Sequence, residues 1–99
     1  MIVVTERAKE ELKKILANKV NYPGAGLRLT ASDRGNFGLK IDAEAPDDRV
    51  VKHEGLIVLL VEERLDDGLQ EHTLAFENDK FIIAKGPLSG FNKSTVTLD

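Results

Sequence analysis

Two short segments of alternating apolar and polar residues, joined by a turn, constrain the fold of this chain most. Apolar residues fall at every second position of both segments: Leu27, Leu29 and Ala31 in the first, and Phe37, Leu39 and Ile41 in the second. The turn between them, residues 33–36, contains Gly35 and Asn36. Period-two alternation on both sides of such a turn predicts a β-hairpin with one half-buried face.

An amphipathic helix is predicted before this hairpin. Thr5 can cap its first turn, and Glu6 lies near the positive end of the helix dipole. The helix carries one apolar stripe at helical spacing: Ala8, Leu12, Ile15 and Leu16. Asn18 and the Tyr-Pro-Gly sequence at residues 22–24 are expected to end it. Residues 2–5, which are β-prone, predict a short strand before the helix.

The residues after the hairpin predict a pair of strands. An acidic connector, residues 42–48, leads to a short strand over 49–53. A Glu-Gly turn then precedes the continuous apolar run 56–61. Because that run is apolar on both faces, we expect it to be the central strand of the sheet.

The last third of the chain predicts a short helix and a second strand pair. Apolar residues spaced by four indicate the helix: Val61, Leu65 and Leu69. Leu74 and Phe76 alternate before an Asn-Asp turn that leads into the strand 81–84. The tail, which contains Pro87, Gly90, Phe91, Val96 and Leu98, is expected to add a last irregular strand.

These elements predict one α+β domain. Strands that follow one another through tight turns favour an antiparallel sheet over a parallel one. The chain has 99 residues, of which 41% are apolar and 31% charged, as in a globular domain with a modest core. A chain this short buries only about 60–70% of its unfolded surface, so association with itself or with a partner would add burial.

Residues 26–38 carry a resemblance to a known family. The sequence Gly26-Leu-Arg-Leu, followed by a turn with Gly35 and Gly38, resembles the signature loop of the A-type iron–sulfur carriers, the HesB-like family. The opening Val-Thr-x-x-Ala, the x-Glu-Gly turn and the stretch 86–91 are also similar. The resemblance covers essentially the whole chain and implies a single HesB-like domain over residues 1–99. Its implied fold is a compact, mostly antiparallel β barrel or sandwich with an N-terminal helix and a short second helix.

The chain departs from that family at the cluster ligands. In the family, the residue two before the second glycine is a cysteine that binds iron, and a Cys-x-Cys pair supplies further ligands. Here that position is Asn36, and the chain contains no cysteine. Thiolate metal sites, disulfides and cysteine-ligated clusters are therefore excluded. We interpret Asn36 as a turn residue, because asparagine tolerates a left-handed backbone.

A metal site without cysteine is the alternative. It would combine the two histidines with nearby carboxylates: His53 and His72 with Glu54, Glu71, Asp47 or Asp48. Nitrogen and oxygen ligands of this kind suit zinc or iron, but the spacing matches no metal motif. We expect His53 to be exposed beside its turn, and His72 to point inward with its hydrogen bonds satisfied.

Other site classes find little support. The acidic stretch 42–48 lacks the order of an EF-hand and is expected to be a solvated connector. Arg28 and Arg34 could bind anions, but ordinary surface arginines are the simpler interpretation. No Gly-x-Ser-x-Gly motif is present, and two histidines offer few general bases.

Charge and hydropathy exclude some partners. The net charge of −3 comes from interspersed acidic and basic residues, which argues against nucleic acid. No apolar run approaches the ~20 residues that span a bilayer, and the first residues lack a signal-peptide core, so we expect a cytoplasmic protein.

The sequence therefore predicts a non-catalytic, protein-binding accessory module with a HesB-like fold, associated with iron–sulfur assembly and able to form a homo-oligomer. The alternative is a protein that handles iron or zinc through histidine and carboxylates. We assign no catalytic, cofactor-binding or metal-binding residue, and no cofactor.

Overall fold

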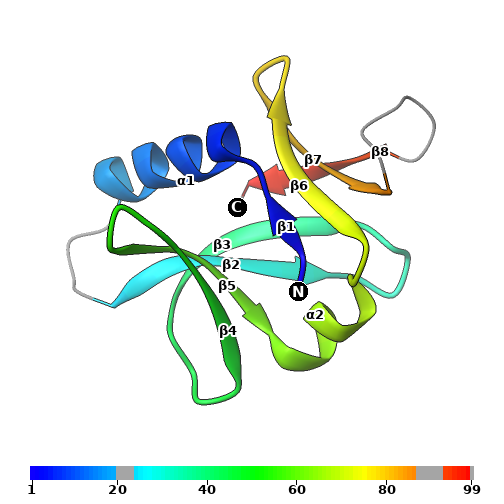
Figure 1. Ribbon diagram of the computed structural model, residues 1–99, viewed down its shortest axis with the longest axis horizontal. Coiled ribbons are helices and arrows are strands. Elements are labelled where there is room, and N and C mark those ends of the chain that lie inside the picture. The colour runs from blue at the N-terminus through cyan, green and yellow to red at the C-terminus, as the bar shows by residue number, and fades with distance from the viewer. Residues whose placement is uncertain (20–23, 87–92, 99) are drawn as a thin grey trace.

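The structure is a computed structural model that describes residues 1–19, 24–86 and 93–98 (Figure 1). Two helices and eight strands follow one another along the chain: β1 (Val3–Val4), α1 (Glu6–Lys19), β2 (Ala25–Ala31), β3 (Phe37–Ala43), β4 (Asp48–His53), β5 (Leu56–Glu62), α2 (Glu63–Gly68), β6 (His72–Glu77), β7 (Lys80–Lys85) and β8 (Lys93–Leu98). Neither helix of this described part is long and apolar enough to cross a membrane.

All eight strands belong to one curved sheet in the order β1-β6-β7-β8-β3-β2-β5-β4, which nearly closes into a barrel (Figure 1). Four pairings are antiparallel: β2 with β3, β4 with β5, β6 with β7, and β7 with β8. Three are parallel: β1 with β6, β2 with β5, and β3 with β8. The predicted α+β fold with a mostly antiparallel sheet is confirmed, and the parallel pairings join segments distant in the sequence.

The predicted hairpin is formed by β2 and β3. Leu29 pairs with Leu39 and Leu27 with Ile41, so the apolar residues of both strands share one face. Leu27, Leu29 and Leu39 are buried in the core, as their alternation predicts. β2 continues the sheet by pairing in parallel with β5, and β3 does so by pairing with β8.

Helix α1 is confirmed with its predicted cap. The Thr5 hydroxyl accepts the N–H of Ala8 at 3.2 Å, which satisfies a donor of the first turn. Ala8 and Leu12 are fully buried, and the helix packs against β5 and β6. The helix extends to Lys19, and most of the Tyr-Pro-Gly sequence expected to end it lies outside the described residues.

The second half of the chain follows the prediction with two corrections. Residues 58–61 of β5 are fully buried, but β5 lies between β2 and β4, next to an edge, so it is not the central strand. The short helix begins at Glu63 rather than at Val61, which belongs to β5, and Leu69 lies just beyond its end. The last strand is confirmed as β8, and residues 87–92 of the expected tail lie outside the described part.

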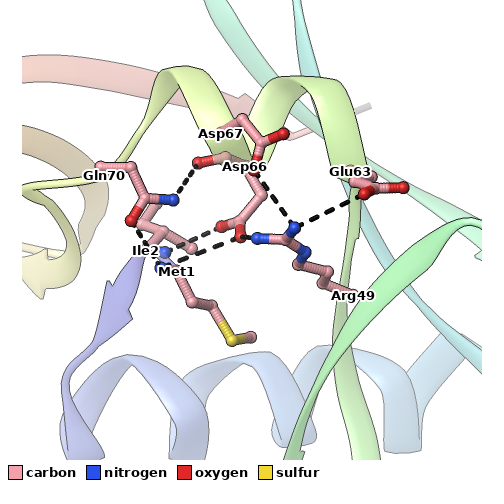
Figure 2. A network of polar contacts seen from close by, with 7 residues as sticks. All are labelled: Met1, Ile2, Arg49, Glu63, Asp66, Asp67 and Gln70. Carbon is pink, nitrogen blue, oxygen red and sulfur yellow. Dashed lines mark hydrogen bonds and ion pairs between the residues drawn. The ribbon is translucent and has the colours of Figure 1, made fainter.

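The two edge strands of the sheet, β1 and β4, are held together by a buried carboxylate (Figure 2). Asp66 of α2 is fully buried, the only polar side chain so buried in the described part of the chain. Its Oδ1 accepts the N–H of Ile2 at 2.8 Å, directly before β1. Its Oδ2 accepts Nη1 of Arg49, on β4, at 2.8 Å. One side chain therefore connects both edges of the open barrel.

Further contacts surround this carboxylate. Nη2 of Arg49 lies 3.2 Å from Asp67 Oδ1 and 3.7 Å from Glu63 Oε1. The Met1 ammonium lies 4.0 Å from Asp66 Oδ2 and donates to Gln70 Oε1 at 3.1 Å. The hydrogen bond to Asp66 is the main reason that the pKa of Arg49 is raised. Arg49 therefore stays charged opposite the buried carboxylate.

We expect Leu59→Ala to lower the free energy of unfolding by about 2–5 kcal/mol, because the removed side chain is fully buried in the core. Leu56→Ala, at the 54% exposed start of the same strand, is the matched control and should cost much less. Urea unfolding of both variants measures the difference. Equal losses would show that the burial of β5 is wrongly placed.

We expect Asp66→Asn to cost about 1.5–3 kcal/mol, because a charge-assisted hydrogen bond to Arg49 is lost inside the protein. Asp67→Asn is the matched control, since its side chain contacts the same Arg49 but is 59% exposed. Its loss should stay below about 0.5 kcal/mol. Thermal and urea unfolding compare the two, and equal effects would contradict a special role of the buried carboxylate.

Candidate functional site

The hairpin tip is the place where the resemblance locates an iron ligand. It is a tight, exposed turn built around Ser32. The Ser32 hydroxyl accepts the N–H groups of Arg34 and Asn36 at 3.3 and 3.2 Å, and the Ser32 N–H donates to the Asn36 carbonyl at 2.8 Å. Gly35, with φ of 78°, takes the left-handed position. Asn36 does not, so its place in the turn is confirmed but the conformational reason given for it is wrong.

The glycines of the signature frame have packing roles of their own. A Cβ on Gly26 would lie 2.9 Å from Ile57 Cγ2, where β2 packs closely against β5. A Cβ on Gly38 would lie 2.9 Å from Thr30 Oγ1 and 3.4 Å from the carbonyl of Thr97 on β8. Contacts under 3.0 Å force a shift of backbone or side chain. The glycine frame therefore serves the close approach of strands, whatever residue occupies position 36.

His53, at the end of β4, is part of a charge network with α1. Its side chain is only 11% exposed, because it lies between two carboxylates: Nε2 is 3.1 Å from Glu54 and Nδ1 is 3.8 Å from Glu6. The expectation that it would be exposed is therefore wrong. Each carboxylate also pairs with a lysine of α1, Glu54 with Lys13 and Glu6 with Lys9, both at 3.2 Å. The bond from Lys13 is the main reason that the pKa of Glu54 is lowered.

His72, the first residue of β6, lies elsewhere in the sheet and is half-buried. Its Nδ1 is buried without a hydrogen-bond partner among the described residues, so the expectation of a satisfied histidine is wrong. Within the same residues, no three side chains of His, Asp or Glu are grouped so that they could hold a metal ion. The structure does not bring the two histidines and their candidate carboxylates together.

Arg28 forms the strongest charge cluster outside the Asp66 network, which we call the Arg28 clamp. Its guanidinium binds Asp48 with two hydrogen bonds of 2.6 Å and Asp42 with one of 2.7 Å. A fourth bond, of 3.1 Å, reaches the carbonyl of Ala43. The side chains of Arg28 and Asp48 are 15% and 2% exposed. A bidentate, largely buried arginine of this kind fixes the geometry of both partners.

The clamp corrects two expectations from the sequence. Arg28 is not an ordinary surface arginine, whereas Arg34 is exposed as expected. The connector 42–48 is anchored at both ends rather than simply solvated, because Asp42 and Asp48 bind the same guanidinium. Hydrogen bonds from Arg28 are the main reason that the pKa values of Asp42 and Asp48 lie below their ordinary range.

A hollow of about 420 Å³ lies between the end of α1, the start of β2 and the β4–β5 turn. Its walls are mostly apolar, with Leu16, Leu56 and Ile57 among them. Its ionisable described residues are two lysines, Lys13 and Lys52. This chemistry suits the binding of an apolar group and offers no paired acid and base for a reaction.

We expect the Arg28 clamp to make stability depend on acid pH. The folded pKa of Asp48 is lowered, so its contribution is fully present above the unfolded value of about 3.9 and is lost as the pH falls through the folded value. Asp48→Asn should flatten the loss of stability below about pH 4. Asp47→Asn, its exposed neighbour, is the control and should leave the pH profile unchanged. Urea unfolding between pH 2 and pH 7, a range around that reference pKa, tests this.

No protein-family model matches the chain, and no curated protein matches it. Two solved structures do. Escherichia coli SufA, described as involved in biosynthesis of iron–sulfur clusters, is 22% identical with a TM-score of 0.63, over 83% of this chain and 80% of the other. A putative Fe-S biosynthesis protein from Lactobacillus acidophilus is 15% identical with a TM-score of 0.55, over 98% and 86%. The chain therefore has the fold of the A-type iron–sulfur carriers, and it has no cysteine.

Proposed function

We propose that this chain is a non-catalytic, HesB-like accessory module that binds proteins of iron–sulfur cluster assembly. The observation that carries the proposal is the combination of a carrier-like fold with a chain that contains no cysteine. We further propose that residues 1–99 form a single domain without a cofactor, and that it acts in the cytoplasm. The similar structures are described as iron–sulfur biosynthesis proteins, which supports partners in that process.

The physical argument separates the fold from the ligands. Iron–sulfur clusters need thiolate ligands, and an asparagine amide in place of one thiolate binds iron far more weakly. The hairpin itself is held by the packing of Gly26 and Gly38 and by the Arg28 clamp, none of which involves a metal ligand. A chain of this kind can therefore keep the surface of a carrier while lacking its cluster chemistry.

Binding to proteins is favoured over other partners. The net charge of −3 is small and mixed, which argues against nucleic acid, and we propose no membrane partner. Several large apolar side chains are exposed: Met1, Val3, Leu56 and Leu98. Such residues support contacts with a partner or with a second copy in a homo-oligomer.

Affinity capture from the native host tests this function. The tagged chain is mildly cross-linked in cells and its neighbours are identified by mass spectrometry, with an unrelated domain of similar size as control. We expect enrichment of cluster scaffolds, cysteine desulfurase or iron–sulfur apo-proteins. Reproducible recovery of other proteins, with none of these, would contradict the assignment to iron–sulfur assembly.

We expect Asn36→Cys alone to form no stable cluster, because a single thiolate leaves an iron–sulfur cluster without its further ligands. Anaerobic reconstitution with iron and sulfide, followed by desalting, should leave no visible absorption band and no stoichiometric iron. The unchanged chain is the control. A coloured, stoichiometric cluster in the monomeric variant would show that residues other than cysteine complete a site at the hairpin tip.

A further inference from the structure

The edges of β1 and β4 border an opening in the barrel wall, which we call the edge window. It is a hollow of about 380 Å³, lined by Met1, Ile2, Val3, Val4, Lys9, Val50, Val51 and Lys52. Figure 2 shows β1 on one side and β4 on the other, with the Asp66 network above and α1 below. The side chain of Met1 extends into the space between the strands (Figure 2).

The strands that border the edge window have free edges. β1 pairs only with β6 and β4 only with β5 among the described strands, so neither has a strand partner on the side of the window. Unpaired N–H and C=O groups on a strand edge can pair with an added extended segment. Two exposed apolar side chains lie at the same place, Val3 at 58% and Met1 at 47%.

The charge of the edge window is positive. Its only ionisable side chains are Lys9 and Lys52, and no carboxylate lines it. Lys9 is paired with Glu6 at 3.2 Å, whereas the exposed Lys52 forms no ion pair with any described residue. An occupant that brings carboxylates beside apolar groups therefore complements this lining.

A second copy of the chain complements it less well. Antiparallel pairing of β4 with β4 of another copy over all six residues would place Arg49 opposite Lys52 twice. Like charges directly opposite each other in a sheet are destabilising. A lysine on an edge strand is also a common means by which proteins prevent such self-association.

We propose that the edge window binds an extended acidic segment of a partner protein. The segment adds to the free edge of β4, places alternate apolar side chains against Val3 and Met1, and directs its carboxylates to Lys52. The flexible Met1 side chain adapts to these apolar groups, as methionine does at other binding surfaces. This inference rests on the proposed function as a protein-binding module and names the class of partner. The short edge predicts a small interface and weak affinity.

An array of capped hexapeptides tests the charge and the site. In one set, apolar residues alternate with Asp or Glu, and in the matched set the same apolar residues alternate with Lys or Arg. We expect members of the acidic set to bind the full chain and the basic set to show no binding. Lys52→Glu should reduce binding of the acidic set at least tenfold and allow binding of the basic set.

Charge reversal at another exposed lysine, Lys80→Glu at the start of β7, is the matched control and should leave binding unchanged. Melting temperatures show whether each variant is folded. The proposal is overturned if no acidic peptide binds, or if Lys80→Glu weakens binding as much as Lys52→Glu. A dimer in sedimentation velocity that Val3→Asp dissociates would also overturn it, because a second copy would then cover the window.

Capture from the native host separates this inference from the proposed function. If Lys52→Glu recovers the same iron–sulfur assembly partners as the unchanged chain, the edge window is not the binding site but the proposed function stands. If the unchanged chain recovers none of those partners while acidic peptides bind at the window, the proposed function fails and the window remains a peptide site.

Discussion

A buried carboxylate on a short helix holds this barrel-like sheet together where its strands fail to close it. Asp66 accepts hydrogen bonds from the chain before β1 and from Arg49 on β4, and so connects edges that do not pair with each other. Breaking a buried charge pair leaves an uncompensated charge, so such a contact penalises alternative arrangements of the two edges. Below it, the same two strands leave open the window that we propose as a peptide site.

The hairpin of β2 and β3 explains how this fold exists without the metal ligands of similar proteins. Its strands approach their neighbours closely at Gly26 and Gly38, and Arg28 fixes the connector through Asp42 and Asp48. None of these interactions depends on the residue at position 36, where an exposed asparagine completes the turn. Stability and cluster binding are therefore separable properties of this hairpin.

Much of the local structure could be predicted from the sequence. The helix stripe, the alternation of the hairpin and the turn residues each act over a few positions, and all the predicted strands are present. Part of the Arg28 clamp was also within reach, since pairing of Arg28 with Lys40 makes Asp42 its diagonal neighbour on β3. Asp48 was not, because it reaches Arg28 only after β4 and β5 join the sheet beside β2.

The sequence by itself determined the element types, the buried faces of the hairpin and helix, and the exclusion of thiolate chemistry. Each follows from local periodicity or from the absence of cysteine. Only the tertiary structure decided the three parallel pairings, the place of β5 beside an edge, and the burial of His53 and Asp66. These depend on contacts between residues far apart in the chain, because the burial and pairing of a charged side chain are set by the elements that fold around it.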